Sequence, residues 1–244
     1  MEGNLMDSKL NGNFFKKAGV TASLLTLSLL VNPAHAVNWQ EVGDAGQLLG
    51  TAQEPLGNGP LRNIRGAVST NADVDLYKIF ISDPTIFSAS VISVSGNFDS
   101  VLALFNQGGF GVYGNDDARL GDSNAGLPAG SLLGPQAPGW YYLAIFGLDT
   151  TPTSGNGTTP DHYIAPNTSA PFTSVIGASG PGGASPLTGW APVAPGDVIT
   201  LNEDYRIRLS GVSVVPEPET CAMLLAGLGL VGAMARRRKA FIER

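Results

Sequence analysis

The chain has 244 residues, a formal net charge of −6, and only 14% charged and 8% aromatic residues. Its 32 glycines and 17 prolines favour short strands joined by turns and argue against a helical bundle. Between Val37 and Val215 lie 15 acidic and 6 basic residues. This balance disfavours binding to nucleic acid or anionic lipid and suits divalent cations.

Residues 1–36 have the three parts of a secretory signal peptide. Two lysines supply the positive end, and residues 18–31 form the apolar middle. Ala34 and Ala36 are the small residues of a cleavage site. We therefore expect signal peptidase to cut after Ala36 and to release an exported domain.

Residues 37–214 carry short strand patterns separated by turn residues, apart from a weak helical pattern at 41–52. In the last of these patterns Tyr205, Ile207 and Leu209 alternate with polar residues, as in a half-exposed strand. The run at 140–146 is apolar on both faces, which predicts a central buried strand. The strands are expected at 64–68, 74–82, 86–94, 101–105, 112–113, 140–146 and 204–214.

The stretch 150–200 is dominated by Gly, Pro, Ser and Thr, and we interpret it as an irregular insertion between two strands. A short strand is expected within it at 172–176. About seven short strands without a sustained internal helix predict an all-β fold. The sequence therefore predicts an antiparallel, jelly-roll-like β-sandwich.

Several short motifs follow one another along these strands: Asp73-Val74-Asp75-Leu76-Tyr77, Asn97-Phe98-Asp99-Ser100, Gly114-Asn115-Asp116-Asp117, Gly139-Trp140-Tyr141-Tyr142 and Asp204-Tyr205-Arg206-Ile207. The series resembles the bacterial pre-peptidase C-terminal domain, a β-sandwich appended to many secreted proteins. The resemblance covers residues 64–146 and 204–214, and it implies the same fold. The insertion after Gly147 departs from the pattern of that family.

Six acidic and amide side chains occupy turns or strand starts: Asp73, Asp75, Asp99, Asn115, Asp116 and Asp117. Calcium takes six to eight oxygen ligands, which carboxylates and turn carbonyls supply. If the loops gather at one end of the sandwich, Asp73, Asp75, Asp116 and Asp117 form one calcium site. The alternative is that these side chains stabilise turns by bonding to the local backbone.

Catalytic residues are hard to find in this chain. After signal removal the one histidine is His162, which lies in the irregular insertion, and neither G-x-S-x-G nor H-E-x-x-H occurs. The lone cysteine, Cys221, lies outside the expected mature domain and supplies it no thiol nucleophile. We therefore expect no enzymatic activity. A carbohydrate-binding module would instead expose aromatic residues such as Trp190 and Tyr163.

The end of the chain has three parts in order. Residues 216–218 read Pro-Glu-Pro and lead into an apolar run at 221–235. A helix over this run would be about 22 Å long. We expect it to cross a membrane, with the arginines in the cytoplasm and the domain outside. The flanking residues of the pattern are Pro216, Glu217 and Pro218 before the run and Arg236, Arg237, Arg238 and Lys239 after it.

This order resembles the PEP-CTERM sorting signal of Gram-negative bacteria, whose tail is recognised and removed by the membrane enzyme exosortase. The resemblance implies an exported protein of the cell surface or of an extracellular polysaccharide matrix, such as a biofilm. The expected organisation is a signal peptide at 1–36, a sandwich at 37–214 and a sorting signal at 215–239. The expected role is structural or binding. The alternatives are a carbohydrate-binding module, a calcium-dependent adhesion domain and, last, a secreted hydrolase.

Overall fold

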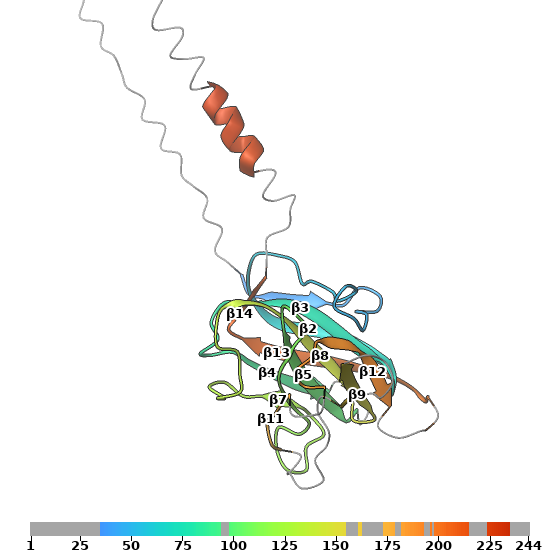
Figure 1. Cartoon of the computed structure of the whole chain (residues 1–244). Coiled ribbons are helices and arrows are strands. Elements are labelled where there is room, and N and C mark those ends of the chain that lie inside the picture. Colours follow the sequence, from blue (N-terminus) through green and yellow to red (C-terminus); the bar gives the residue numbers. More distant parts are fainter. Residues whose placement is uncertain are drawn as a thin grey trace, which may run out of the picture. The chain divides into compact units, whose positions relative to one another are not determined.

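The computed structural model describes residues 35–93, 98–154, 161–162, 173–178, 182–192, 196, 198–214 and 224–234. Most strands belong to one large, mainly antiparallel sheet that curls around a common core, and a second sheet has three strands (Figure 1). The predicted antiparallel sandwich is therefore confirmed.

The strands follow one another closely along the chain. Their bounds are β1 (Val37–Gln40), β2 (Gly59–Thr70), β3 (Val74–Ile81), β4 (Ser88–Ser93), β5 (Ser100–Asn106), β6 (Gly111–Asn115), β7 (Gly126–Leu127), β8 (Gly139–Gly147), β9 (Thr150–Ser154), β10 (Asp161–His162), β11 (Ile176–Gly177), β12 (Leu187–Pro192), β13 (Thr200–Ser210) and β14 (Val212–Val214). The large sheet has the order β11-β6-β5-β8-β3-β14-β2-β13-β4-β7, and β1 runs parallel to β2 beside it.

Strand β8 is buried on both faces, as its sequence predicts. Leu143 and Ile145 point into the main core, which the curled sheet encloses. Ala144 and Phe146 point the opposite way, into a second apolar cluster. Because side chains alternate across a strand, an uninterrupted apolar run is what such a two-sided position requires.

The last predicted strand, 204–214, is divided in two. Tyr205, Ile207 and Leu209 are at most 1% exposed, so the predicted alternation of β13 is confirmed. Gly211 then adopts a φ of 71° and separates β13 from β14. Glycine suits this left-handed conformation, and a Cβ here would also lie 3.0 Å from the Phe87 backbone. The break lets β14 pair with β3 and β2 instead of β4.

The insertion at 150–200 has more structure than the sequence predicts. Strands β9, β10 and β12 form the three-stranded sheet, and β11 pairs with β6 of the large sheet. Leu187 and Trp190 of β12 pack against the second cluster, so the insertion covers the outer face of β5 and β8. Of the strand expected at 172–176, only Ile176 lies in a strand, β11; residues 173–175 are not strand, and residue 172 lies outside the described residues.

The helix predicted at 41–52 is wrong. This segment consists of bends and turns, and its polar groups bond both within the segment and to the sandwich. Glu41 accepts hydrogen bonds from the backbone of Ala45 and Ala67, and Gly46 O accepts one from Leu76 N. Strand β1, which the sequence did not predict, precedes it. Ala67 and Leu76 lie far from this segment in the sequence, so a local pattern does not reveal these two contacts.

Residues 224–234 of the apolar tail form a helix. In the part of the chain that the structure describes, no helix is both long and apolar enough to span a bilayer. The remainder of the predicted span at 221–235 lies outside the described residues, as do 216–218, 236–238 and the signal segment up to Ala34.

Candidate functional site

The predicted ligands belong to two separate groups of carboxylates. In each group the carboxylate oxygens lie within 4.8 Å of one another. The first group is Asp44, Asp73 and Asp75, and the second is Asp99, Asp116 and Asp117. The expectation that Asp73, Asp75, Asp116 and Asp117 form one site is therefore not met. We call the first group, together with Glu41, Tyr77 and Tyr205, the inner cluster, and the second group the loop cluster.

In the inner cluster Asp73 stabilises the turn between β2 and β3. Its Oδ2 accepts hydrogen bonds from the backbone N–H of Ser69 at 2.7 Å and from the Ser69 hydroxyl at 2.8 Å. Its own N–H donates to Thr70 O. These contacts agree with the turn-stabilising alternative, because aspartate is favoured where it can bond to the local backbone.

Asp75 lies in β3, is 1% exposed, and ends a chain of hydroxyl hydrogen bonds. The Tyr205 hydroxyl donates to Asp75 Oδ2 at 2.6 Å, and the Tyr77 and Tyr205 hydroxyls are 2.6 Å apart. Because the single Tyr205 proton goes to Asp75, Tyr77 donates to Tyr205. Burial raises the pKa of both tyrosines, so they remain neutral donors.

The Asp75 carboxyl also faces the carboxyl of Glu41, within hydrogen-bonding reach. Burial raises the pKa of Asp75 to about 8, with the Tyr205 hydrogen bond lowering it in part and the negative charges of Glu41 and Asp73 contributing to the rise. Burial also raises the pKa of Glu41. A pKa of about 8 favours the protonated carboxyl at neutral pH. Asp75 Oδ1 is buried and has no hydrogen-bond partner among the described residues, so it is the oxygen that can carry this proton toward Glu41.

Gly66 of β2 makes this arrangement possible. It is buried and lies directly opposite Tyr205 in the ladder between β2 and β13. A Cβ at this position would lie 2.6 Å from Tyr205 Cζ and would also clash with the Tyr205 hydroxyl and with Glu41 Oε2. The absence of a side chain lets the carboxyls and the tyrosine ring approach the strand closely.

The loop cluster has no such hydroxyl donor among the described residues. Asp99 precedes β5, and Asp116 and Asp117 follow β6, so two adjacent strands bring them together. The Oδ1 atoms of Asp99 and Asp116 are buried, and no donor from the described part of the chain reaches them. Burial, followed by the charges of Asp99 and Asp117, raises the pKa of Asp116 to about 7.

The surroundings of the loop cluster add more negative charge. Burial raises the pKa of Asp99, and the charges of Asp117 and Asp149 raise it further. The pKa of Asp117 is raised by burial and by Asp122. Asp122 forms an ion pair with Arg119 at 3.5 Å. Because the arginine is exposed, this ion pair is weak. Carboxylates that repel one another in this way favour a bound cation.

Asn115 has a structural role beside the loop cluster. It is 1% exposed, its Oδ1 accepts from Gly126 N at 3.0 Å, and its Nδ2 donates to Ser174 O at 3.2 Å. Asn115 therefore connects β6 to β7 and to the insertion. Both ends of its amide already have partners. Its proposed role as a calcium ligand stays a prediction.

The insertion contains three residues that the sequence analysis considered for catalysis or carbohydrate binding: His162, Trp190 and Tyr163. His162 lies in β10, where it pairs with Thr153, and its side chain lies outside the described part of the structure. Trp190 packs with its ring centroid 4.8 Å from that of Phe146, and its Nε1 donates to Gln47 O at 2.7 Å. Trp190 is thus a packing residue of the second cluster. Tyr163 lies outside the described residues.

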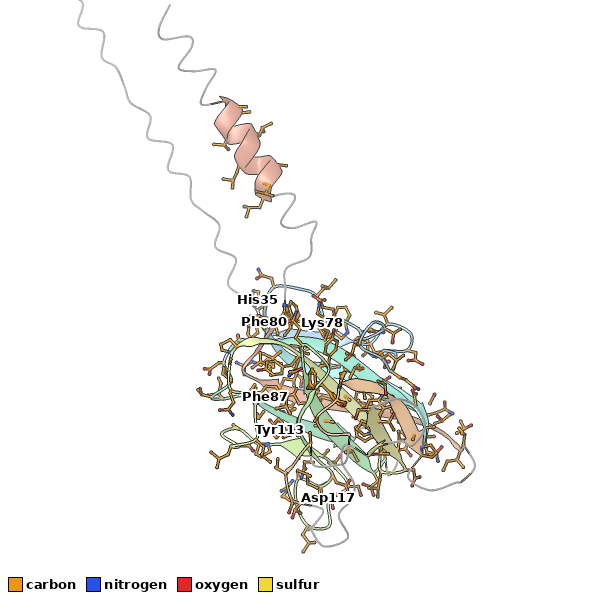
Figure 2. All side chains as sticks on the ribbon, viewed as in Figure 1. His35, Lys78, Phe80, Phe87, Tyr113 and Asp117 are labelled. Atoms are coloured by element: carbon orange, nitrogen blue, oxygen red, sulfur yellow. The ribbon has the colours of Figure 1, made fainter. Side chains whose placement is uncertain are left out.

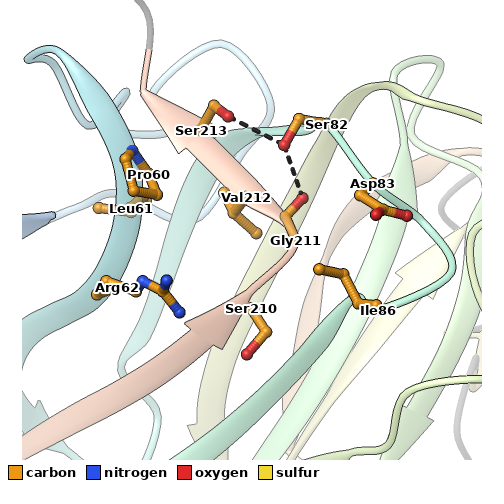
Figure 3. Close-up of a pocket in the computed structure, with 10 residues that line it drawn as sticks. All are labelled: Pro60, Leu61, Arg62, Ser82, Asp83, Ile86, Ser210, Gly211, Val212 and Ser213. Atoms are coloured by element: carbon orange, nitrogen blue, oxygen red, sulfur yellow. Dashed lines mark hydrogen bonds between the residues drawn. The ribbon is translucent and has the colours of Figure 1, made fainter. Parts of the chain in front are cut away.

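A pocket of about 330 Å³ lies where β14 departs from β13 (Figure 3). The Ser213 hydroxyl donates to Ser82 Oγ at 2.9 Å, and the Ser82 hydroxyl donates to Gly211 O at 3.2 Å. Asp83 Oδ1 accepts from the backbone and the hydroxyl of Thr85. These polar groups satisfy one another, so the pocket is explained by the break between the two strands.

Comparison with known proteins identifies the end of the chain. A family model described as the PEP-CTERM protein-sorting motif matches residues 214–239. No curated protein matches the chain. The motif implies recognition by exosortase and export to the cell envelope or surface, so the chain is an exported protein with a sorting tail. The resemblance of residues 64–146 and 204–214 to the pre-peptidase C-terminal domain is not confirmed and stays a prediction.

Sequence reasoning missed the two other acidic members of the inner cluster and did not assign its two tyrosines to a site. Glu41 and Asp44 belong to the segment for which a helix was predicted, and only the packing of that segment against β3 brings them to Asp75. The available signal was an excess of acidic residues in a short polar segment. That signal does not specify a contact, because the partners are about thirty residues apart in the chain.

Proposed function

We propose that this chain is a non-catalytic surface or matrix protein of a Gram-negative bacterium, with a structural or binding role in extracellular polysaccharide. The observation that carries the proposal is the PEP-CTERM motif at 214–239. The motif begins at Val214, the last residue of β14. An acidic domain of this kind is soluble and disfavours anionic partners.

The processing of both ends tests this proposal. The full chain is produced in a Gram-negative host that has exosortase and in the same host without it, and intact mass is measured on each cell fraction. We expect surface material that starts at Val37 and lacks residues after the Pro-Glu-Pro segment, and an uncut tail without exosortase. Cytosolic protein with both termini intact would contradict the proposal.

We also propose that the domain binds calcium, and that the loop cluster is the principal site. Support comes from the mutual approach of Asp99, Asp116 and Asp117 and from the buried Oδ1 atoms of Asp99 and Asp116, which no described donor reaches. Calcium accepts flexible sets of carboxylate and carbonyl oxygens, which suits residues contributed by two loops. A bound cation would remove the repulsion that raises the pKa of Asp116.

Isothermal titration of calcium chloride into the purified full chain tests this site. We expect saturable heat for the natural chain, and none for Asp116→Asn, which keeps the size of the side chain but removes its charge. Asp83→Asn is the matched control, because Asp83 lies in the turn after β3, where Thr85 occupies its carboxylate. Equal heats for the natural chain and Asp116→Asn would exclude the loop cluster.

The loop cluster also favours one alternative, a calcium-dependent adhesion domain. That function predicts clumping of cells that display the chain, which calcium restores and a chelator abolishes. A secreted hydrolase is the remaining alternative, because a carboxyl with a pKa of about 7 suits a general acid. A hydrolytic activity lost in Asp116→Asn would favour the enzyme over our proposal.

A further inference from the structure

A shallow groove of about 380 Å³ lies at the ends of β5 and β8, away from both acidic clusters. Its volume falls within the range of about 300–1,000 Å³ that is common for small-molecule sites. We call it the aromatic groove. The residues that matter for its chemistry are Asn106, Gln107, Phe110, Trp140 and Tyr141.

The ring of Trp140 is held in place by its neighbours on β3. The edge of Phe80 meets it with 5.4 Å between ring centroids and 74° between planes. Lys78 Nζ lies 4.4 Å from the indole centroid and is itself bonded to Glu54 at 2.9 Å. Lys78 and Phe80 lie close together at one end of the domain (Figure 2). A ring fixed in this way loses little side-chain entropy when a ligand packs on it.

Phe110 supplies a second aromatic ring, which is 40% exposed, on the turn between β5 and β6. Asn106 Oδ1 accepts hydrogen bonds from Gly108 N at 2.9 Å and Phe110 N at 3.1 Å, so the amide fixes the turn that presents this ring. The Asn106 Nδ2 group donates to no residue that the structure describes, and Gln107 beside it is exposed. The groove thus combines two aromatic rings with amide groups.

The residues that line the groove carry no charge, although the domain around it is acidic. The one ionisable residue among them, Tyr141, uses its hydroxyl to donate to Ala137 O at 2.8 Å. Lys78, whose ammonium group lies over the Trp140 ring, is paired with Glu54. The uncharged lining argues for an uncharged ligand, because a charged one would lose its hydration without gaining a partner.

We propose that the aromatic groove binds a neutral polysaccharide. The apolar face of a sugar ring carries C–H groups that pack on aromatic faces, and its hydroxyls bond to amides such as those of Asn106 and Gln107. The inference deepens the proposed role in extracellular polysaccharide and rests on it. It also assigns the carbohydrate contact to Trp140 and Phe110, since Trp190 is engaged in packing.

Calorimetric titration of the purified full chain with neutral hexasaccharides tests this site, with cellohexaose, maltohexaose and mannohexaose as probes and an alginate hexamer as the acidic comparison. We expect at least one neutral probe to bind, and binding to weaken about tenfold or more in Trp140→Ala and in Phe110→Ala. Ile86→Ala is the matched control, because Ile86 is 54% exposed and lies outside the groove. Circular dichroism and thermal melting check that each variant is folded.

Phe110→Ala keeps the test decisive if Trp140→Ala fails to fold, since Phe110 is the more exposed ring. Binding of no neutral probe, or of alginate alone, overturns the proposal. Neutral binding that is unchanged in Phe110→Ala also overturns it, because the site then lies elsewhere. Cell fractionation distinguishes these outcomes from failure of the sorting role, which would show as absence of the chain from the surface.

Discussion

The inner cluster and the loop cluster use the same residue type in opposite ways. In the inner cluster, Asp75 is 1% exposed but has a tyrosine donor on one oxygen and Glu41 facing the other. In the loop cluster, Asp99 and Asp116 have buried oxygens that no described donor reaches. The comparison teaches that the supply of hydrogen-bond donors, and not the number of carboxylates, separates a structural network from a site suited to a cation.

The largest expected effect is on the pH dependence of folding. The pKa of Asp75 rises from 3.8 to about 8 on folding, so the folded state binds the proton more tightly than the unfolded state. The stability that this proton contributes is fully present below about pH 4. As the pH rises from about 4 to about 8, the free energy of unfolding falls by up to about 1.4 kcal/mol per pH unit. Denaturant titrations across this window measure the loss.

The variant Asp75→Asn tests whether this pH dependence of stability comes from Asp75. The amide resembles the protonated acid, because it accepts from Tyr205 and donates toward Glu41. We expect its stability to decline less with pH than that of the natural chain. Asp83→Asn is the control, since Asp83 is exposed and its pKa is lowered by Thr85. An unchanged pH slope in Asp75→Asn would show that Asp75 is ionised in the folded domain.

The next effect concerns the space around the inner cluster. Gly66→Ala places a methyl group against the Tyr205 ring and Glu41, and we expect a loss of about 3 kcal/mol in the free energy of unfolding. Gly50→Ala is the matched control, because a Cβ there meets nothing within 4 Å, and it should change stability by less than about 0.5 kcal/mol. Equal stabilities for the two variants would show that the cluster is looser than described.

A smaller effect is expected for the hydroxyl chain. Tyr205→Phe removes the donor to Asp75 and the acceptor for Tyr77, and leaves the ring in place. We expect a loss of about 2 kcal/mol, because two buried polar groups lose their partners. Tyr141→Phe, which removes a hydroxyl bond near the surface, should cost about half as much. Chemical denaturation compares them, and the reverse order would contradict this account.

Much of the sandwich could be predicted from the sequence, because its patterns are local. The run at 140–146 and the alternation in Tyr205, Ile207 and Leu209 record which faces are buried, and the structure confirms both. The strands of the insertion at 150–200 could not be predicted from such local patterns. Strands β9 and β12 are stabilised by pairing with each other and by packing on β5 and β8.

The individual residues of the candidate site could be predicted from the sequence, but their division into two clusters could not. Asp73, Asp75, Asp99, Asp116 and Asp117 stand out by their positions at turns and strand starts. Their division into two clusters depends on the order of strands in the sheet and on the packing of residues 41–46 against β3. Neither leaves a periodic signal in the sequence.

The central claim is that calcium binds the loop cluster while protons satisfy the inner cluster. It is tested most directly by the calcium-induced rise in melting temperature of the full chain and of its Asp75→Asn and Asp116→Asn variants. At a calcium concentration about 100 times the dissociation constant, binding adds about 2.7 kcal/mol of stability. We predict equal rises for the natural chain and Asp75→Asn and none for Asp116→Asn. A rise that persists in Asp116→Asn and disappears in Asp75→Asn would contradict the claim.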